Sequence, residues 1–280
     1  MKITQEKLNE IVESHGKWLR KEKGGERANL YKADLSNVNL QGVNLCGADL
    51  SVANFHGANL SETNLSGARL YVANLSEANL YKANLVDTDL RSANLSEANL
   101  YKVDFADADL RRANFCGADL RGANFIEANL RSVSLRKTKL CGAKFYRANL
   151  FDADFYRADL CEADFAGADL KGAKFCRTNL HNASLCNANL CFTDLSKTYY
   201  QLTRIGSRNA TTTYCVEDDN IICGCWNDYE GGTLVEFEER VESVYGEHGE
   251  TPNKKYYTQY MAAIEFFRKM ATLAKEENNA

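Results

Sequence analysis

Large apolar residues recur at every fifth position over most of the chain. From residue 30 to residue 195, each position divisible by five is Leu or Phe, which gives 34 consecutive units without an insertion. The position two residues earlier is always Ala, Val or Thr, and the position just before the Leu or Phe is Asn or Asp in 28 units. The other positions are polar, small or variable. A period of five fits neither the 3.6 of an α-helix nor the 2.0 of an open strand.

The repeat predicts a coiled β-structure. In extended backbone, side chains two residues apart point to the same side, so the small residue and the Leu or Phe of each unit both face inward. Asn and Asp suit the turn that must follow each short strand. Units this short bury no face alone, so they must stack coil on coil. Proline is absent from residues 28–197, as expected where it would remove a donor from the ladder between coils.

The placement of Phe indicates the number of sides of the coil. All 17 repeat positions that end in 0 are Leu, and the eight Phe residues all stand at positions that end in 5. This second period of ten requires an even number of sides. It predicts a four-sided coil with one unit on each side and Phe on two opposite walls, so that 34 units make 8.5 coils. At about 4.8 Å per coil the rod is roughly 40 Å long. The Phe residues are Phe55, Phe105, Phe115, Phe125, Phe145, Phe155, Phe165 and Phe175.

The units share the pattern A(D/N)LXX, seen in Ala-Asp-Leu at residues 33–35 and again at 118–120. Over residues 28–197 this pattern resembles the pentapeptide-repeat family. The resemblance implies an all-β solenoid, a right-handed quadrilateral parallel β-helix. Members of the family include DNA-mimicking proteins that protect gyrase from quinolones, and many bacterial, cyanobacterial and phage-associated proteins without assigned activity. The flanking residues 15–19 and 232–234 look like those of prophage-type members.

A solenoid exposes apolar surface at both ends, so caps are expected. Residues 1–27 are predicted to form a helical cap on the first coil. The helix spans residues 5–21, begins after the N-cap Thr4 and ends before Gly24 and Gly25. Its apolar face contains Leu8, Ile11, Val12, His15, Trp18 and Leu19.

The period stops after Lys197, and residues 198–280 are predicted to form a small α/β unit. Strands are expected at 201–205, 211–216 and 221–226, with a hairpin loop at 217–220. A helix begins with a capping box formed by Thr233 and Glu236, and a last helix begins near Lys254.

The residue types offer no reaction centre. His56 and His181 lie on the exterior of the solenoid, more than six coils apart, and no Ser/His/Asp set or phosphate-binding loop is present. We therefore expect no catalytic residue, no cofactor and no enzyme activity. Cys223 and Cys225 are spaced like two of the four ligands of a zinc site. Cys215 and His248 would have to supply the other two ligands. Packing of both sulfurs as small apolar groups is favoured over a metal site.

Seven cysteines of the repeat share the outward position just after the Leu or Phe: Cys46, Cys116, Cys141, Cys161, Cys176, Cys186 and Cys191. No secretory signal is recognised in the sequence, so we expect a cytoplasmic protein with reduced thiols. Cys141 and Cys161 are four units apart and should stack on consecutive coils. Under mild oxidant they are the preferred pair for a disulfide.

The same spacing of four units arranges the outer side chains in columns. One column contains Tyr81, Tyr101 and Arg121, and the next contains Arg91, Arg111 and Arg131, with Arg112 beside it. These columns are the candidate interaction surface. Stacked arginines repel one another unless acids interleave them, so the alternatives are a mutually neutralised wall and a binding stripe for an acidic partner.

The distribution of charge argues against both DNA mimicry and nucleic-acid binding. Residues 28–197 contain 19 Lys and Arg against 19 Asp and Glu, residues 198–280 have a net charge of -6 and residues 1–27 have +2. A DNA mimic requires a strongly acidic rod, and general nucleic-acid binding requires a basic face. No apolar run is long enough to span a membrane.

Together these patterns predict a non-catalytic scaffold or protein-interaction module with an unidentified protein partner. The alternative is a DNA-mimicking modulator of a type II topoisomerase such as gyrase, which the neutral rod disfavours. The sequence leaves open whether the chain is a monomer or an end-to-end dimer. It also leaves open whether residues 198–280 only cap the solenoid or bind as well.

Overall fold

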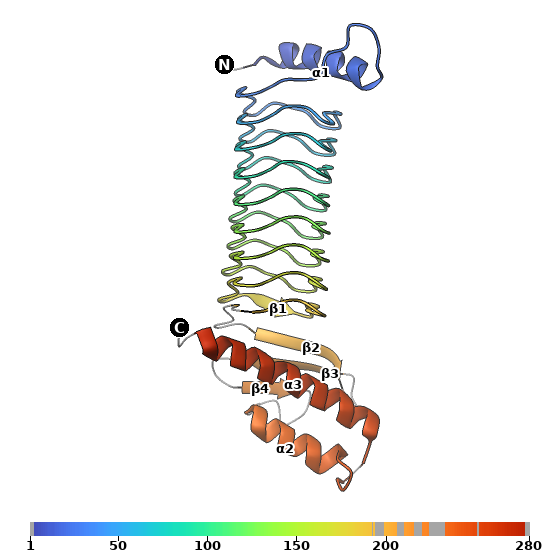
Figure 1. Ribbon diagram of the computed structural model, residues 1–280, viewed down its shortest axis with the longest axis vertical. Helices are drawn as coiled ribbons and strands as arrows, with labels where there is room; N and C mark the ends of the chain where they lie inside the picture. Colours follow the sequence, from blue (N-terminus) through green and yellow to red (C-terminus); the bar gives the residue numbers. More distant parts are fainter. Residues whose placement is uncertain are drawn as a thin grey trace.

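The computed structural model describes residues 3–191, 193, 199–205, 210–215, 220–223, 233–250 and 252–277. Figure 1 shows a straight stack of coils with helix α1 (Gln5–Leu19) across its first coil and a small sheet with two helices at its other end. The rod is a four-sided parallel β-helix. None of the helices within the described part of the chain combines the length and the apolar character that crossing a membrane requires.

One coil contains four units, as the period of ten predicted. Each bridge joins a residue to the residue 20 positions later, from Asn29 with Asp49 to Asp169 with Asn189. In the first coil the Leu30 amide donates to the Asp49 carbonyl at 2.7 Å, and the Asp49 amide donates to the Ala28 carbonyl at 3.0 Å. The ladder on each wall therefore joins consecutive coils and leaves no free strand edge along the rod.

Each corner of the coil is a tight turn. In the first one the Ala33 amide donates to the Leu30 carbonyl at 3.0 Å, and Lys32 has a φ of 57°. A left-handed residue at this place is typical of a type II turn, which favours glycine. Many units nevertheless place Lys, Glu or Asp there, because the ladder also fixes this residue: the Lys32 amide donates to the Ser51 carbonyl at 3.0 Å.

Asn and Asp have a different role from the predicted one. They are not turn residues but the bridge residues of the strands. Their side chains support the following corner: the Asn29 Oδ1 accepts from the Tyr31 amide at 3.2 Å. They also bond along the wall, since the Asn74 amide group donates to Asn54 at 2.9 Å. The side-chain oxygen thus satisfies a corner amide that the ladder leaves unpaired.

The predicted core is confirmed over the described coils. The Leu and Phe residues from Leu30 to Leu180 are buried, and Leu185 is partly buried. Phe residues stack along each of two opposite walls, for example Phe125 on Phe145 at 4.9 Å between ring centroids. Phe rings of different walls meet edge to face, as Phe105 and Phe115 do at 5.7 Å. Leu195 lies outside the described residues.

Helix α1 caps the first coil as predicted, with two differences. It ends at Leu19, and Trp18 is 39% exposed where the pattern placed it on the buried face. Trp18 stacks on His15 with 5.3 Å between the ring centroids, so only one side of the indole is covered. Leu8 and His15 are buried, and the His15 Nδ1 accepts from the Ala28 amide at 3.0 Å.

At the other end the ladder continues into a sheet of order β1-β2-β3-β4. Strand β1 (Asn179–His181) pairs in parallel with β2 (Tyr199–Ile205), and β3 (Ala210–Cys215) and β4 (Asn220–Cys223) follow in antiparallel pairs. The expected loop at 217–220 and strand end at 224–226 fall largely outside the described residues.

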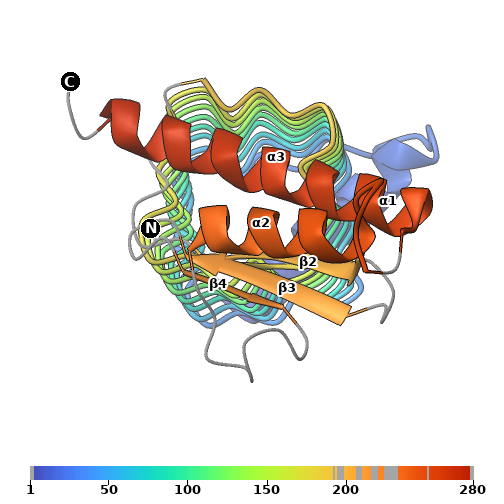
Figure 2. The same ribbon diagram turned by 90° about the horizontal axis from the view of Figure 1, so that it is seen from below.

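Helices α2 (Leu234–Tyr245) and α3 (Lys254–Glu277) lie side by side against this sheet (Figure 2). The capping box is present, because the Thr233 hydroxyl accepts from the Glu236 amide and the Glu236 carboxylate accepts from the Thr233 amide. The helices bury Leu234, Phe237, Val241, Ile264 and Phe267.

Candidate functional site

The described residues contain no group of three or more His, Cys, Asp and Glu residues placed to hold a metal ion. The zinc alternative includes Cys225, which lies outside those residues. His56 is on the exterior, where its Nδ1 is 3.0 Å from the Ser76 hydroxyl. The outer columns of side chains lie at the corners of the rod, and the candidate interaction surface is therefore found there.

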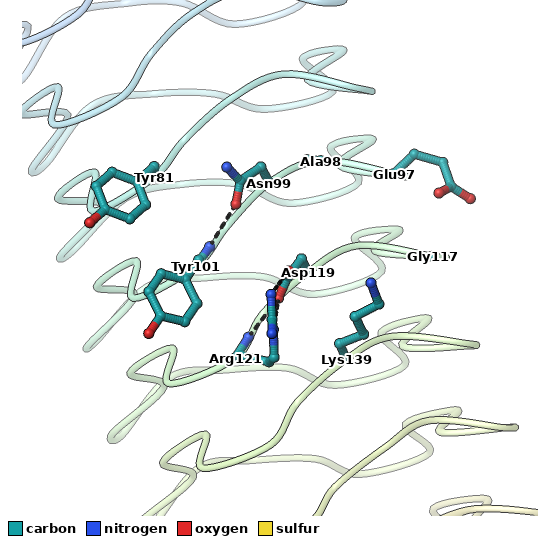
Figure 3. A pocket seen from close by; sticks show the side chains of 9 residues that line it. All are labelled: Tyr81, Glu97, Ala98, Asn99, Tyr101, Gly117, Asp119, Arg121 and Lys139. Carbon is teal, nitrogen blue, oxygen red and sulfur yellow. Dashed lines mark hydrogen bonds and ion pairs between the residues drawn. The ribbon is translucent and has the colours of Figure 1, made fainter.

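The first candidate column forms the Tyr81 corner, defined as Tyr81, Tyr101 and Arg121. Figure 3 shows the three side chains on consecutive coils, and the two tyrosine rings stack with centroids 5.9 Å apart and an angle of 8°. The Arg121 guanidinium lies 5.5 Å from the Tyr101 centroid. With Glu97 and Lys139 these side chains line an open groove of about 460 Å³.

The arginine of the Tyr81 corner is already paired. Its guanidinium donates two hydrogen bonds to Asp119, at 2.8 Å from Nε and 2.6 Å from Nη2. This hydrogen-bonded pair lowers the pKa of Asp119 and raises the pKa of Arg121. The corner thus offers a stack of two tyrosine rings and a locally neutralised cation.

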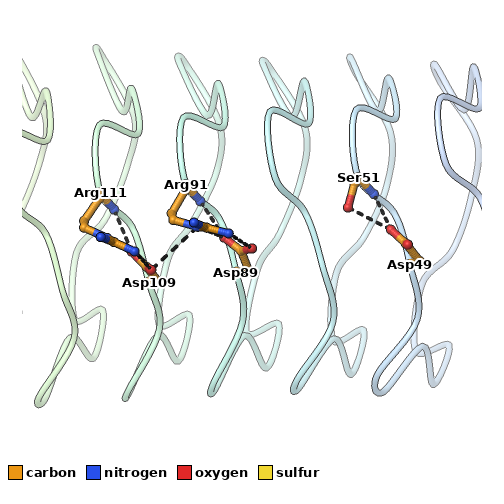
Figure 4. A network of polar contacts seen from close by, with 6 residues as sticks. All are labelled: Asp49, Ser51, Asp89, Arg91, Asp109 and Arg111. Atoms are coloured by element: carbon orange, nitrogen blue, oxygen red, sulfur yellow. Dashed lines mark hydrogen bonds and ion pairs between the residues drawn. The ribbon is translucent and has the colours of Figure 1, made fainter.

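The second candidate column forms the Arg111 corner, defined as Tyr71, Arg91, Arg111, Arg112 and Arg131. With two serines they line a groove of about 490 Å³. Figure 4 shows Arg91 and Arg111 on neighbouring coils, each held by the aspartate of its own unit. The Arg91 Nη2 is 2.7 Å from Asp89, and the Arg111 Nη2 is 2.6 Å from Asp109.

Aspartates lie between the arginines in only part of this column. The Arg91 Nε also lies 3.7 Å from Asp109, which joins two coils, and hydrogen bonding from Arg91 lowers the pKa of Asp89. Arg112 and Arg131 form no ion pair with any described residue. Arg131 instead lies 4.7 Å above the Phe151 ring. The expected neutralised wall therefore exists at two arginines and fails at the other two. Arg91 and Arg111 each have an aspartate two residues earlier, whereas Arg131 has Asn129 and Arg112 has the buried Leu110 there.

The two columns are not neighbours, contrary to the prediction, so the two corners do not form one surface. Tyr81 and Arg91 are two units apart, which is two of the four sides of a coil. The Tyr81 corner and the Arg111 corner are therefore diagonally opposite on the rod.

The Arg111 corner has an apolar extension that was not predicted from the sequence. Seven large apolar side chains are classed as exposed in the described part of the chain, and four of them share this corner on its first three coils. They are Tyr31, Val52, Tyr71 and Val72, with exposed fractions of 51%, 37%, 44% and 41%. The signal was available, since all four follow a Leu whose number differs from 110 by a multiple of 20.

Cys141 and Cys161 stack on consecutive coils as predicted, in the column that continues the Tyr81 corner. Their Cα atoms are 4.5 Å apart and a disulfide joins them, whereas the sequence analysis expected reduced thiols. The fixed register of the ladder brings the two sulfurs together. The other described cysteines of the repeat are free and partly or fully exposed.

The closed four-sided coil with a filled core defines the class of protein: a non-globular β-solenoid that presents columns of side chains. The chain belongs to the pentapeptide-repeat family, and its fold is the right-handed quadrilateral β-helix of that family. The family model of pentapeptide repeats matches residues 28–67, 73–112, 108–145, 128–167, 143–182 and 163–199.

Several solved structures are similar to this chain. HetL from the cyanobacterium Nostoc sp. strain PCC 7120, a pentapeptide repeat protein involved in heterocyst differentiation regulation, is 31% identical, with 65% of this chain and 95% of HetL covered and a TM-score of 0.38. A pentapeptide repeat protein of the Arabidopsis thaliana thylakoid lumen is 33% identical over 36% of this chain and 71% of its own, with a TM-score of 0.36. QnrB1, a plasmid-mediated fluoroquinolone resistance protein, is 19% identical, with coverage of 60% and 91% and a TM-score of 0.38. No match was found among proteins of curated function.

Proposed function

We propose that this protein is a non-catalytic interaction module whose rod holds a partner protein at its corners. The observation that carries the proposal is the Arg111 corner, where exposed aromatic and guanidinium groups stand in register on consecutive coils. Tyr and Arg are the residue types that concentrate binding energy in protein interfaces.

The rigidity of the rod supports this function. Backbone bonds on every wall hold the coils, so the outer side chains are presented on a scaffold that loses little conformational entropy on binding. Both corner grooves are open to solvent, and within the described chain Arg112 and Arg131 form no ion pair. A partner that supplies carboxylates to those two groups would complete a pairing that the rod leaves unfinished.

The DNA-mimic alternative finds no support at this corner. A protein that replaces DNA on an enzyme must present anionic side chains in ladders, and here the unpaired charges are cationic. The 19 acids of the repeat are balanced by 19 bases, and several of them already bind arginines of the rod.

The test is affinity capture from the native host with the full chain as bait. The double variant R112E/R131E should lose the captured partner. The matched control R157E/R177E makes the same charge change at the second turn position of a different corner, and should retain it. Substitution of Tyr81 and Tyr101 by Ala tests the opposite corner separately. Capture that is identical for the wild type and all three variants would contradict the proposal.

A further inference from the structure

The Arg111 corner and its apolar extension form one continuous stripe along the rod. It runs from Tyr31 to Arg131, which is a span of five coils. At about 4.8 Å per coil the stripe is about 24 Å long. Its first part carries the four exposed apolar side chains together with Lys32, whose Nζ lies 5.0 Å from the Tyr31 ring centroid, and its second part carries the arginines. The Arg91 guanidinium joins the two parts, since it lies 5.4 Å from the Tyr71 ring centroid.

The backbone of this corner cannot bind a partner strand. The amides of residues 31, 32 and 33 already donate to Asn29, Ser51 and Leu30, and the same pattern recurs along the corner except at the Tyr71 amide, because residue 69 is Arg rather than Asn or Asp. Because the strands run around the rod and are paired on both sides, a partner finds no sheet edge to extend. Recognition at the stripe therefore depends on side chains.

The spacing of the stripe matches a helix better than an extended chain. Side chains on one face of a helix recur about every 5.4 Å along the axis, and those on one face of a strand recur about every 6.8 Å. Over the two steps from Arg91 to Arg131 the rod advances about 9.6 Å. Two repeats along a helix exceed this distance by about 1.2 Å, which long arginine side chains can accommodate. Two repeats along a strand exceed it by about 4 Å.

The charges of the corner require an anionic ligand. Four guanidinium groups face two aspartates, and the bidentate bonds of Arg91 and Arg111 engage both carboxylates. Arg112 and Arg131 keep their donors for a ligand, as their lack of ion pairs within the described chain shows. Each can receive one carboxylate in a forked hydrogen bond.

We infer that this stripe binds an amphipathic helix of about 16 residues from a partner protein, a length set by about 24 Å at 1.5 Å per residue. One half of its contact face is aliphatic and covers Tyr31, Val52, Tyr71 and Val72. The other half carries Asp or Glu at helical spacing and pairs with Arg112 and Arg131. The inference rests on the proposed function and specifies the partner segment.

A designed peptide tests the inference directly. It is a fluorescently labelled helix of that length with Leu at its first, fifth and eighth positions and Glu at its ninth, twelfth and sixteenth, in an Ala- and Gln-rich background. Binding to the full-length protein is measured by fluorescence anisotropy. A second peptide of equal composition carries the glutamates on the opposite helix face. We expect saturable, salt-sensitive binding of the first peptide that is about tenfold tighter than that of the second.

Reversal of the charges on the protein and on the peptide tests whether Arg112 and Arg131 bind the peptide's glutamates. R112E/R131E should weaken binding of the designed peptide about tenfold, and a peptide with Lys in place of Glu should recover the loss on this variant. R157E/R177E should bind like the wild type. Val72→Asn, which removes the apolar contact without adding a charge, should weaken binding without changing its salt dependence. Circular dichroism melting of each variant verifies that the rod is folded.

The outcomes separate the inference from the proposed function. Equal binding of both peptides, or binding unaffected by R112E/R131E, overturns the inference. If host protein is still captured through the same two arginines, the proposed function stands. A concentration-dependent dimer in sedimentation that R112E/R131E abolishes would assign the stripe to a second copy of this chain and would also overturn the inference.

Discussion

Replacement of Leu110 by Ala should destabilise the rod strongly. Leu110 is 0% exposed and lies in the wall column between Leu90 and Leu130, with a full coil on each side. The substitution removes three carbon atoms. At about 0.8 kcal/mol per methylene, the lost burial costs about 2.4 kcal/mol.

The cavity adds to this loss. Structures that close around a deleted side chain lie at the low end of the range of about 2–5 kcal/mol for Leu→Ala. Here the hydrogen bonds between coils hold each wall at the fixed spacing of the ladder, so the neighbouring coils cannot move together to fill the cavity: the Leu110 amide itself donates to the Asn129 carbonyl at 2.8 Å. We therefore expect a loss of about 4 kcal/mol.

Urea unfolding followed by far-UV circular dichroism measures the change. Leu30→Ala in the same column is the matched control. Leu30 has a coil on one side and helix α1 on the other, and a helix shifts into a cavity more easily than a coil, so its loss should be smaller. Leu110→Lys should prevent folding, because it buries an unpaired charge. A soluble Lys variant as stable as the wild type would refute the assignment of this column to the core.

Three further predictions concern the redox state, pH and gyrase. Peptide mapping after mild oxidation should find Cys141 linked to Cys161, and a link from Cys116 to Cys141 instead would contradict the coil of four units. Burial lowers the pKa of His15, so the cap should have its full stability above the ordinary His pKa of about 6.5 and lose it as the pH falls below that value. Hydrogen exchange at the Ala28 amide, which donates to His15, measures this opening, and an exchange rate that is independent of pH after correction for intrinsic chemistry would disprove it. The neutral rod should leave gyrase supercoiling unchanged at micromolar concentration, and salt-sensitive inhibition would instead favour DNA mimicry.

The sequence alone determined the architecture of the rod. A period of five places the same two side chains inward in every unit, and the restriction of Phe to alternate units requires an even number of sides. Both inferences depend only on chain geometry and on the need to bury apolar residues, which act alike in every coil. The stacking of Cys141 on Cys161 follows from the same register. For this reason the core and the columns were predictable without coordinates.

Only the tertiary structure decided what the columns do at the surface. It showed that Asn and Asp support the corner from the strand and that Trp18 is partly uncovered. It also showed that Arg91 contacts the aspartate of the next coil, whereas Arg131 forms no ion pair with a described residue. These features depend on side-chain directions and on neighbours in the adjacent coils, which differ from coil to coil, and a repeat pattern that averages over all units does not contain them.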